Sequence, residues 1–199
     1  MNSENSRVEI AIHQEPKKGN YYCGDSYFYQ ETDQEFVCAL ADGLGSGEYA
    51  LESSKAVMET IQEYIHHSID TIITKCNEVL SNKRGAVLGL LRMNFEEQRY
   101  SFTSIGNIGI ITMTPDGKKK RNIPTAGYLS GYPRQYRVTK DQLSPGLLFF
   151  MFSDGVNERT LSSKTFISQN PDNIMSSFRL QHATPNEDDT TFIAMKYQP

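Results

Sequence analysis

The stretch Phe36-Val-Cys-Ala-Leu-Ala-Asp-Gly-Leu-Gly-Ser-Gly-Glu48 runs from an apolar segment straight into a glycine-rich loop. The apolar part, residues 35–41, has the length and composition of a buried β-strand. After the loop the apolar residues recur at helical spacing, which predicts a helix over residues 48–67 with one buried face: Ala50, Ser54, Val57, Met58, Ile61 and Ile65. Asp42 therefore stands where a strand ends and a loop toward a helix begins.

The rest of the chain is read outward from this stretch. Residues 8–12 and 26–30 are predicted strands before it, and residues 69–80 form a second predicted helix. Further strands are predicted over residues 86–94, 99–105, 109–114, 147–152 and 191–196, with a helix near 171–179. Short turns join several of these strands, so neighbours should be antiparallel, and the order is not the βαβ alternation of a parallel sheet. The sequence predicts a single α+β domain over residues 1–199.

Composition excludes several classes of function. The chain has 199 residues and a net charge of −4, so neither a nucleic acid nor an anionic membrane is an expected partner. The basic run Lys118–Arg121 follows Pro115-Asp116-Gly117 and is predicted to be a solvated hairpin tip. The three cysteines have no metal-ligand spacing, the N-terminus is too polar for a signal peptide, and no apolar run is long enough to span a membrane. We expect a cytoplasmic protein with reduced thiols.

Acidic residues lie at the ends of four predicted strands: Asp25, Asp42, Asp154 and the pair Asp188-Asp189. Carboxylates gathered from strand ends repel one another unless a cation lies between them, and Mg²⁺ and Mn²⁺ prefer oxygen ligands. Asp-Gly is also a common turn dipeptide, and from spacing alone both interpretations stay open. The glycine loop after Asp42 is only a weak signal for a nucleotide site, because it lacks the Gly-Lys-Ser/Thr ending of a P-loop.

Three blocks resemble signatures of the metal-dependent PPM protein phosphatases: Phe36–Glu48, Phe152-Ser-Asp-Gly-Val-Asn-Glu158 and Asp188-Asp-Thr-Thr-Phe192. Gly24-Asp25-Ser26-Tyr27 and Ser104-Ile-Gly-Asn107 match further blocks, and the resemblance spans nearly the whole chain. The form Asp-Gly-x-Gly-Ser-Gly is similar to the compact bacterial branch that controls sporulation and stress sigma factors. The resemblance implies a four-layer α-β-β-α sandwich, in which helix pairs flank two packed antiparallel sheets.

The resemblance also implies a site between the sheets that holds two Mn²⁺ or Mg²⁺ ions. Asp42 would bridge the ions, the Gly43 carbonyl would bind one, Asp154 and Asp188 would ligate the other, and Asp25 would hold a metal-bound water. Asp189 would support them. A metal-activated hydroxide would attack phosphorus directly. The expected substrate is phosphoserine or phosphothreonine on a regulatory protein, of the stressosome scaffold and sigma-factor antagonist type, and the enzyme would be a monomeric feedback regulator of the general stress response.

The chain departs from the family pattern at two positions. Asn20 stands where many members have a phosphate-binding arginine, and Arg7-Val8-Glu9 lies too far upstream to replace it, so Lys17 and Lys18 are the candidate phosphate-binding residues. Leu44 stands where larger relatives have a histidine proposed as general acid. These departures leave open a non-catalytic phosphoprotein-binding module on the same fold. A calcium-binding domain is disfavoured because no EF-hand loop is present, and a cysteine phosphatase because no Cys-x₅-Arg loop is present.

Overall fold

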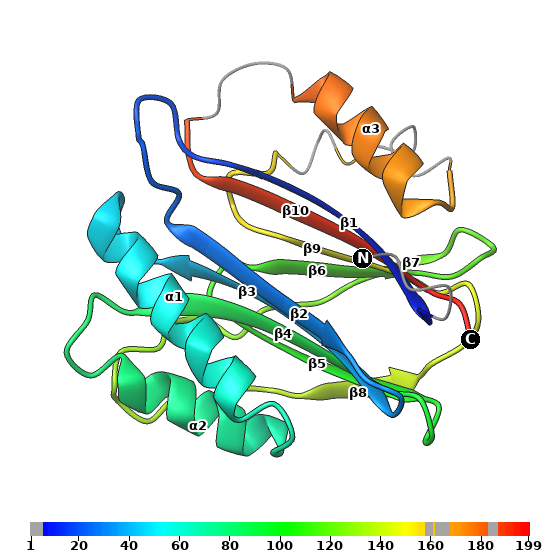
Figure 1. Cartoon of the computed structure of the whole chain (residues 1–199), viewed down its shortest axis with the longest axis horizontal. Coiled ribbons are helices and arrows are strands. Elements are labelled where there is room, and N and C mark those ends of the chain that lie inside the picture. The colour runs from blue at the N-terminus through cyan, green and yellow to red at the C-terminus, as the bar shows by residue number, and fades with distance from the viewer. Residues whose placement is uncertain (1–5, 158–160, 162–167, 183–186) are drawn as a thin grey trace.

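The computed structural model describes residues 6–157, 161, 168–182 and 187–199. Within these residues the chain forms ten strands and three helices (Figure 1). The strands are β1 (Val8–Glu15), β2 (Asp25–Glu31), β3 (Glu35–Gly43), β4 (Ala86–Asn94), β5 (Arg99–Ile105), β6 (Gly109–Met113), β7 (Lys119–Arg121), β8 (Thr139–Gln142), β9 (Leu148–Phe152) and β10 (Thr190–Tyr197). The helices are α1 (Glu48–Glu63), α2 (Ile69–Val79) and α3 (Pro171–Gln181).

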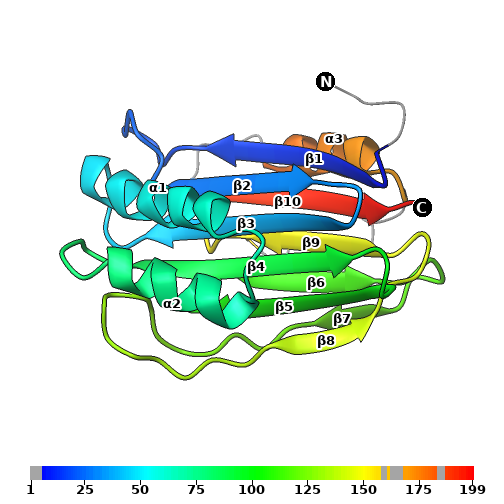
Figure 2. The ribbon, with the colours of Figure 1, turned by 60° about the horizontal axis from the view of Figure 1, so that its bottom comes forward.

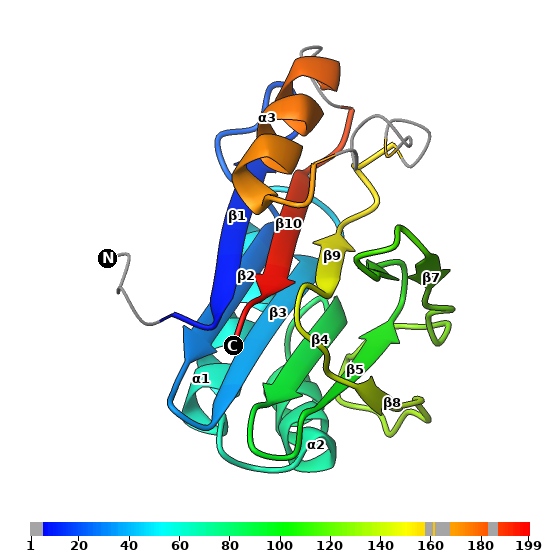
Figure 3. The same cartoon turned by 90° about the vertical axis from the view of Figure 1, so that its right-hand side faces the viewer.

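The strands form two five-stranded sheets that pack face to face (Figure 3). One sheet has the order β2-β3-β4-β5-β8, and the other has the order β1-β10-β9-β6-β7. Every neighbouring pair is antiparallel. The first strand of the chain thus pairs with the last, and β10 lies between β1 at the edge and β9 in the centre of the sheet.

Alternate side chains of each strand fill the space between the sheets. On β3 these are Phe36, Cys38 and Leu40, and they meet residues of the opposite sheet such as Met151 and Ile193. All five side chains are almost completely buried. Because side chains alternate along a strand, the next inward position on β3 after Leu40 is Asp42. The row that builds the core therefore ends in a carboxylate.

Helices cover the outer face of each sheet (Figure 2). The apolar face of α1 and α2, including Ile61 and Ile72, packs on outward residues of β3 and β4 such as Ala39 and Leu88. Phe178 of α3 packs in a cluster with outward residues of β9 and β10 on the other side of the sandwich. The predicted α+β fold of two antiparallel sheets between helices is confirmed. The described residues contain the expected helix pair over one sheet and α3 over the other.

The structure differs from the prediction at several element boundaries. The first strand continues to Glu15, because its whole length pairs with β10. The first helix ends at Glu63, before the predicted His67, since the chain turns at Tyr64 and α2 begins with Ser68 as its N-cap. Strands β7 and β8 were not predicted. The basic run is exposed as expected, but residues 119–121 form an edge strand rather than only a hairpin tip.

Candidate metal centre

Strand pairing brings two of the predicted aspartates side by side. Asp25 is the first residue of β2 and pairs directly with Asp42 near the end of β3. Both therefore project from the same face of the sheet, the face that packs on β9 and β10. Asp154 follows β9 and Asp188 precedes β10, on the sheet opposite. The four carboxylates thus come from strand ends of both sheets.

Asp25 is buried, with 2% of its surface exposed, and its two oxygens differ. Oδ2 accepts hydrogen bonds from the hydroxyl groups of Ser153 at 2.7 Å and Thr191 at 2.6 Å. Oδ1 is also buried and has no hydrogen-bond partner. Burial raises the pKa of Asp25 to about 6 even though these two hydroxyl groups lower it. A buried carboxylate oxygen without a donor is costly, so this atom fits a role as a ligand to a cation or to an ordered water.

The carboxylates at this end of the sandwich destabilise one another's charged forms. Burial, followed by the charges of Asp25, Asp154, Asp188 and Asp189, raises the pKa of Asp42 to about 8. Burial and then the charge of Asp188 raise the pKa of Asp154, although a hydrogen bond from Asn107 Nδ2 at 2.6 Å lowers it. Such a group is stabilised by positive charge placed among its members.

Asp189 holds the loop between β1 and β2 against the site. The residue is 4% exposed, and its two oxygens accept backbone hydrogen bonds from Lys17 and Gly24, each at 2.8 Å. Asp188, its neighbour, is exposed. Both oxygens of Asp189 are occupied by backbone donors, whereas Asp188 accepts one such bond, from the Asp189 N–H to Oδ1 at 2.9 Å, and its side chain faces solvent. The supporting role of Asp189 beside metal ligands stays a prediction, and the structure shows what its carboxylate holds: the backbone of the loop between β1 and β2.

Gly43 lies where no side chain fits. A Cβ at this position would overlap the backbone of Ala50 in the first turn of α1. Its N–H donates to the Gly24 carbonyl at 3.2 Å, which joins the Asp42 loop to the strand that begins with Asp25. The glycine thus allows β3 and α1 to approach closely, and the predicted role of its carbonyl as a metal ligand stays a prediction.

The donor set fits a hard divalent cation that keeps part of its water shell. In the described ranges, no three His, Cys, Asp or Glu side chains are placed so as to hold an ion between them. Carboxylates from both sheets, the free Oδ1 of Asp25 and the Gly43 carbonyl are all oxygen donors. Mg²⁺ and Mn²⁺ prefer oxygen ligands, and Mg²⁺ usually retains several waters. Water molecules would therefore complete the coordination around these residues.

The predicted phosphate-binding lysines lie in the loop next to the site. The backbone of Lys17 reaches Asp189, and no ion pair of Lys17 or Lys18 occurs within the described residues. Asn20 closes a turn by donating its N–H to the Lys17 carbonyl at 2.9 Å. Leu44 packs against the core between the sheets, so its position is taken by a packing residue instead of a proton donor.

The histidines and cysteines do not offer an alternative catalytic group. His182, the C-cap of α3, stacks on Phe178, and His13 meets the same ring edge-on. His66 lies beside Glu35, and His67 lies beside Tyr64. The three cysteines are free thiols, as predicted. Cys23 lies two residues before Asp25, and burial together with the charge of Asp25 raises the pKa of its thiol. A thiolate nucleophile is therefore disfavoured there.

The sequence predicted no role for the polar residues that position the aspartates, although all but Gln14 stand in the signature blocks. These are Gln14, whose amide donates to the Asp25 carbonyl at 3.3 Å, and Ser153, Thr191 and Asn107 described above. The inward-facing rows of β1, β9 and β10 change from apolar to polar side chains at the end that adjoins the site. The polar residues at these positions are Gln14, Ser153 and Thr191. A change from apolar to polar at inward positions of three predicted strands is the signal that would have identified them.

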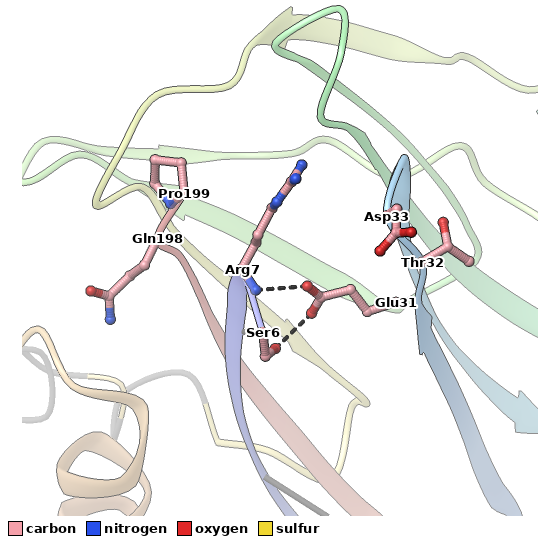
Figure 4. Close-up of a pocket in the computed structure, with 7 residues that line it drawn as sticks. All are labelled: Ser6, Arg7, Glu31, Thr32, Asp33, Gln198 and Pro199. Atoms are coloured by element: carbon pink, nitrogen blue, oxygen red, sulfur yellow. Dashed lines mark hydrogen bonds between the residues drawn. The ribbon is translucent and has the colours of Figure 1, made fainter. Parts of the chain in front are cut away.

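A separate pocket of about 410 Å³ lies at the opposite end of β1 and β2 (Figure 4). Its lining includes Arg7 and Glu31, and the Glu31 carboxylate accepts hydrogen bonds from the Ser6 hydroxyl at 2.7 Å and the Arg7 amide at 2.6 Å. Arg7 precedes β1, whereas Glu15 at the other end of β1 pairs with Thr190 beside the site. Eight extended residues span roughly 25 Å. Arg7 is therefore not a phosphate ligand, as its sequence position indicated.

Glu158, which ends the second signature block, lies outside the described residues, as does the polar N-terminal stretch 1–5. No helix in the described part of the chain combines the length and the apolar character needed to cross a bilayer.

Comparison with known proteins identifies relatives over most of the chain. Residues 32–198 match the family described as Stage II sporulation protein E (SpoIIE). Phosphoserine phosphatase RsbX of Bacillus subtilis (strain 168) is 36% identical over 190 residues, which cover 96% of this chain and 95% of the relative. A crystal structure of RsbX in complex with magnesium superposes with a TM-score of 0.91, at 35% identity and 98% coverage of both chains. The catalytic domain of the serine/threonine phosphatase PstP with two manganese ions shares the fold, with a TM-score of 0.73 at 13% identity over 96% of this chain and 99% of that one.

Proposed function

The chain belongs to the SpoIIE family of PP2C-type (PPM) protein phosphatases, and from that premise we propose that it is a metal-dependent phosphatase acting on phosphoserine or phosphothreonine of a regulatory protein. One observation carries the proposal beyond family membership. Carboxylates from strand ends of both sheets meet in one acidic group, and burial and mutual repulsion raise the pKa of Asp42 to about 8. Such a group is suited to holding divalent cations and, through them, a phosphoryl group.

We assign the roles as follows. Asp42, the Gly43 carbonyl, Asp154 and Asp188 would hold two Mn²⁺ or Mg²⁺ ions. The ions would supply hydroxide at neutral pH and neutralise charge on the phosphoryl oxygens. Asp25 contributes through Oδ1: because Ser153 and Thr191 fix Oδ2, Oδ1 is held in one orientation and can accept a hydrogen bond from a water.

Other residues of the chain keep this group in place. Asn107 orients Asp154, and Asp189 holds the Lys17–Gly24 loop at the edge of the site. Leu44 offers no proton to the leaving group, so protonation by water is expected. Lys17 and Lys18 remain candidates for attracting the phosphorylated substrate because they lie in the loop that Asp189 anchors.

The proposed substrate is a phosphorylated regulatory protein. RsbX, the relative with 36% identity, is a phosphoserine phosphatase. We propose substrates of the stressosome scaffold and sigma-factor antagonist type, and a role in feedback regulation of the general stress response. A monomer is expected to suffice, because all the proposed ligands come from one chain.

The test is phosphate release from matched peptides that carry phosphoserine, phosphothreonine or phosphotyrosine. With Mn²⁺, the wild-type chain should hydrolyse the first two and not the third. Asp42→Ala and Asp154→Ala should abolish release, since each removes a ligand. Activity at wild-type level in both variants would refute the proposed site, and hydrolysis of phosphotyrosine alone would refute the proposed substrate class.

A second candidate is a non-catalytic module that binds a phosphoprotein. The observation in its favour is that Asn20 and Leu44 replace the arginine and histidine of other members of the family. The two candidates separate at saturating Mn²⁺. Tight binding of a phosphoprotein without any release of phosphate supports the module, whereas release supports the enzyme.

A further inference from the structure

Arg84 packs against the loop that carries Asp42 and Gly43. A Cβ placed on Gly45 would clash with the guanidinium of Arg84, so this cation lies directly on the loop, three residues after Asp42. The adjoining backbone is also tied to the loop, because Leu44 N–H donates to the Gly85 carbonyl at 3.0 Å. Arg84 is therefore positioned by the same loop as the proposed metal ligands.

The guanidinium of Arg84 is held on one side and open on the other. It lies over the ring of Tyr49, in the first turn of α1, at 5.0 Å from the ring centroid. Arg84 is exposed and forms no ion pair among the residues that the structure describes. A guanidinium stacked on a ring keeps the N–H groups at its edge available, and these match a phosphate in a bidentate geometry.

The neighbouring lysine shows that exposure alone does not explain this arrangement. Lys83 precedes Arg84, but its ammonium pairs with Glu52 of α1 at 2.5 Å. The charge of Lys83 is thus neutralised by Glu52. The guanidinium of Arg84 lies over an aromatic ring and has no acidic partner among the described residues. Arg84 therefore retains its full capacity to bind an anion.

The acidic group creates a need for such a cation. A phosphoserine dianion approaching Asp25, Asp42, Asp154, Asp188 and Asp189 meets like charge, which the metal ions only partly neutralise. Position 20, where many family members have an arginine, is an asparagine, and Lys17 and Lys18 lie on a loop. Arg84 immediately precedes the short connection to β4 and is braced by Gly45 and Tyr49, so its charge is placed more firmly.

We propose that Arg84 is a substrate-binding residue whose guanidinium donates hydrogen bonds to the phosphoryl oxygens of the phosphorylated side chain. The inference rests on the proposed function and deepens it, since it names the group that holds the phosphate in place of the missing arginine. Arg84 does not bind metal and does not transfer a proton. Its removal therefore affects KM and phosphate affinity, and leaves Mn²⁺ affinity intact.

The probe is inorganic phosphate, titrated calorimetrically into the full chain loaded with Mn²⁺. Loss of a bidentate charge-assisted contact in Arg84→Ala should weaken phosphate binding by about tenfold. KM for p-nitrophenyl phosphate and for a phosphoserine peptide should rise by a similar factor, with kcat nearly unchanged. Arg84→Lys should recover part of the phosphate affinity, because lysine restores the positive charge but not the paired N–H donors of a guanidinium. Arg84→Met keeps the stem packed on Tyr49 and Gly45 and should behave like the alanine variant.

Lys83→Ala is the matched control. It changes the net charge by the same amount at the adjacent residue, and it should leave phosphate affinity and KM at wild-type values. Unchanged phosphate affinity in Arg84→Ala and Arg84→Met, or an equal loss in Lys83→Ala, would overturn the inference. A rise in KM for the peptide alone, with inorganic phosphate bound normally, would also overturn it, because the contact would then not be with the phosphoryl group.

The same titrations separate this inference from the proposed function. If the wild-type chain binds Mn²⁺ and phosphate but releases no phosphate from any substrate, the proposed function fails. Phosphate affinity in the Arg84 variants then still decides whether this residue binds the phosphoryl group.

Discussion

Asp25 has one oxygen fixed by two hydroxyl groups and the other buried without a donor. Buried polar atoms are normally hydrogen-bonded, and an unsatisfied one in a folded protein calls for an explanation. We propose that a cation or its bound water is the partner of this oxygen, and the raised pKa of Asp42 supports the same proposal. In the metal-free protein these carboxylates disfavour one another's charged forms, and the proposed metal would relieve that repulsion.

Replacing Asp42 by asparagine should therefore have opposite effects on stability and on metal binding. In EDTA, Asp42→Asn should melt a few degrees higher than the wild type, because folding disfavours the ionisation of Asp42 and asparagine has no ionisation to lose. Addition of Mn²⁺ should raise the melting temperature of the wild type and not that of the variant. Differential scanning calorimetry measures both effects.

Asp33→Asn makes the same chemical change at the pocket on the far end of β2. It should leave the Mn²⁺-induced shift intact. A variant at Asp42 that keeps this shift would contradict its role as a ligand.

The dependence of stability on pH follows from the raised pKa values of Asp25, about 6, and Asp42, about 8. Both exceed the ordinary value of 3.8, so between about pH 4 and pH 8 the metal-free folded state binds more protons than the unfolded state. These two groups therefore lower the stability of the metal-free protein as pH rises through this window. Mn²⁺ competes with these protons, so its stabilising effect should grow with pH.

Melting temperatures in EDTA and in Mn²⁺ at pH 6, 7 and 8 test this expectation. The difference between the two conditions should be largest at pH 8 and smallest at pH 6. A difference that does not change with pH would show that these carboxylates are already ionised in the metal-free protein.

At the residue scale, the sequence indicated the aspartates but not their partners. Each of Asp25, Asp42 and Asp154 adjoins a predicted strand, and this local context can be recognised from the sequence alone. Ser153 and Thr191 reach Asp25 from 128 and 166 residues away in the chain. Such contacts depend on which strands of the two sheets face each other, which no local pattern specifies.

At the scale of elements, the junction between β3 and α1 determines the geometry of the site. Ser26 of β2 and Ser54 of α1 share a hydrogen bond of 2.8 Å, and Gly43 packs against the first turn of α1. The helix is thereby fixed to both strands that carry Asp25 and Asp42. A shift of α1 would move the loop that holds Gly43.

Gly43→Ala should consequently disturb the site through the backbone. The added Cβ would overlap the backbone of Ala50, so the loop or the helix must move, at a cost of about 1–3 kcal/mol in the free energy of unfolding. Mn²⁺ stabilisation should be lost together with this stability. Urea denaturation with and without Mn²⁺ measures both quantities.

Gly117→Ala is the comparison, because a Cβ there meets no atom within 4 Å and only the positive φ of 83° is unfavourable. It should cost about 1 kcal/mol and leave Mn²⁺ stabilisation intact. If Gly43→Ala behaves like Gly117→Ala, the close contact between Gly43 and α1 does not control the site.

Most helices and strands could be predicted because their apolar residues recur with a strong period. Strands β7 and β8 lack such a period and were not predicted. The apolar faces of α1 and β3 continue over many residues, whereas β7 is exposed at every position and β8 is only partly buried. These two edge strands are held mainly by backbone pairing with β6 and β5. A backbone pair leaves no signature in side-chain pattern.

At the scale of the whole molecule, the two sheets share one core, and we propose that residues 1–199 form one domain. Phe149 is completely buried between the sheets, with its ring 4.9 Å from that of Tyr100 on the opposite sheet. The ligands proposed for the metal are divided between these sheets. Packing of the sheets and assembly of the site are therefore coupled.

Phe149→Ala should lower the free energy of unfolding by about 3–5 kcal/mol and keep a single cooperative transition. Calorimetry and near-ultraviolet circular dichroism should give coincident transitions for wild type and variant. Two separate transitions would contradict a single domain. Neither periodicity nor the family resemblance assigned individual strands to a sheet, and pairs such as β1 and β10 join opposite ends of the chain.

The central claim is that these carboxylates hold divalent metal for hydrolysis of a phosphorylated serine or threonine. The most direct measurement is the rate of phosphate release from a phosphoserine peptide as Mn²⁺ is titrated into EDTA-treated protein, for wild type and Asp154→Asn. The wild type should show no release without metal and a saturable rise with it, and the variant should stay at the baseline. Release by the wild type in EDTA, or equal release by the variant at saturating Mn²⁺, would contradict the account.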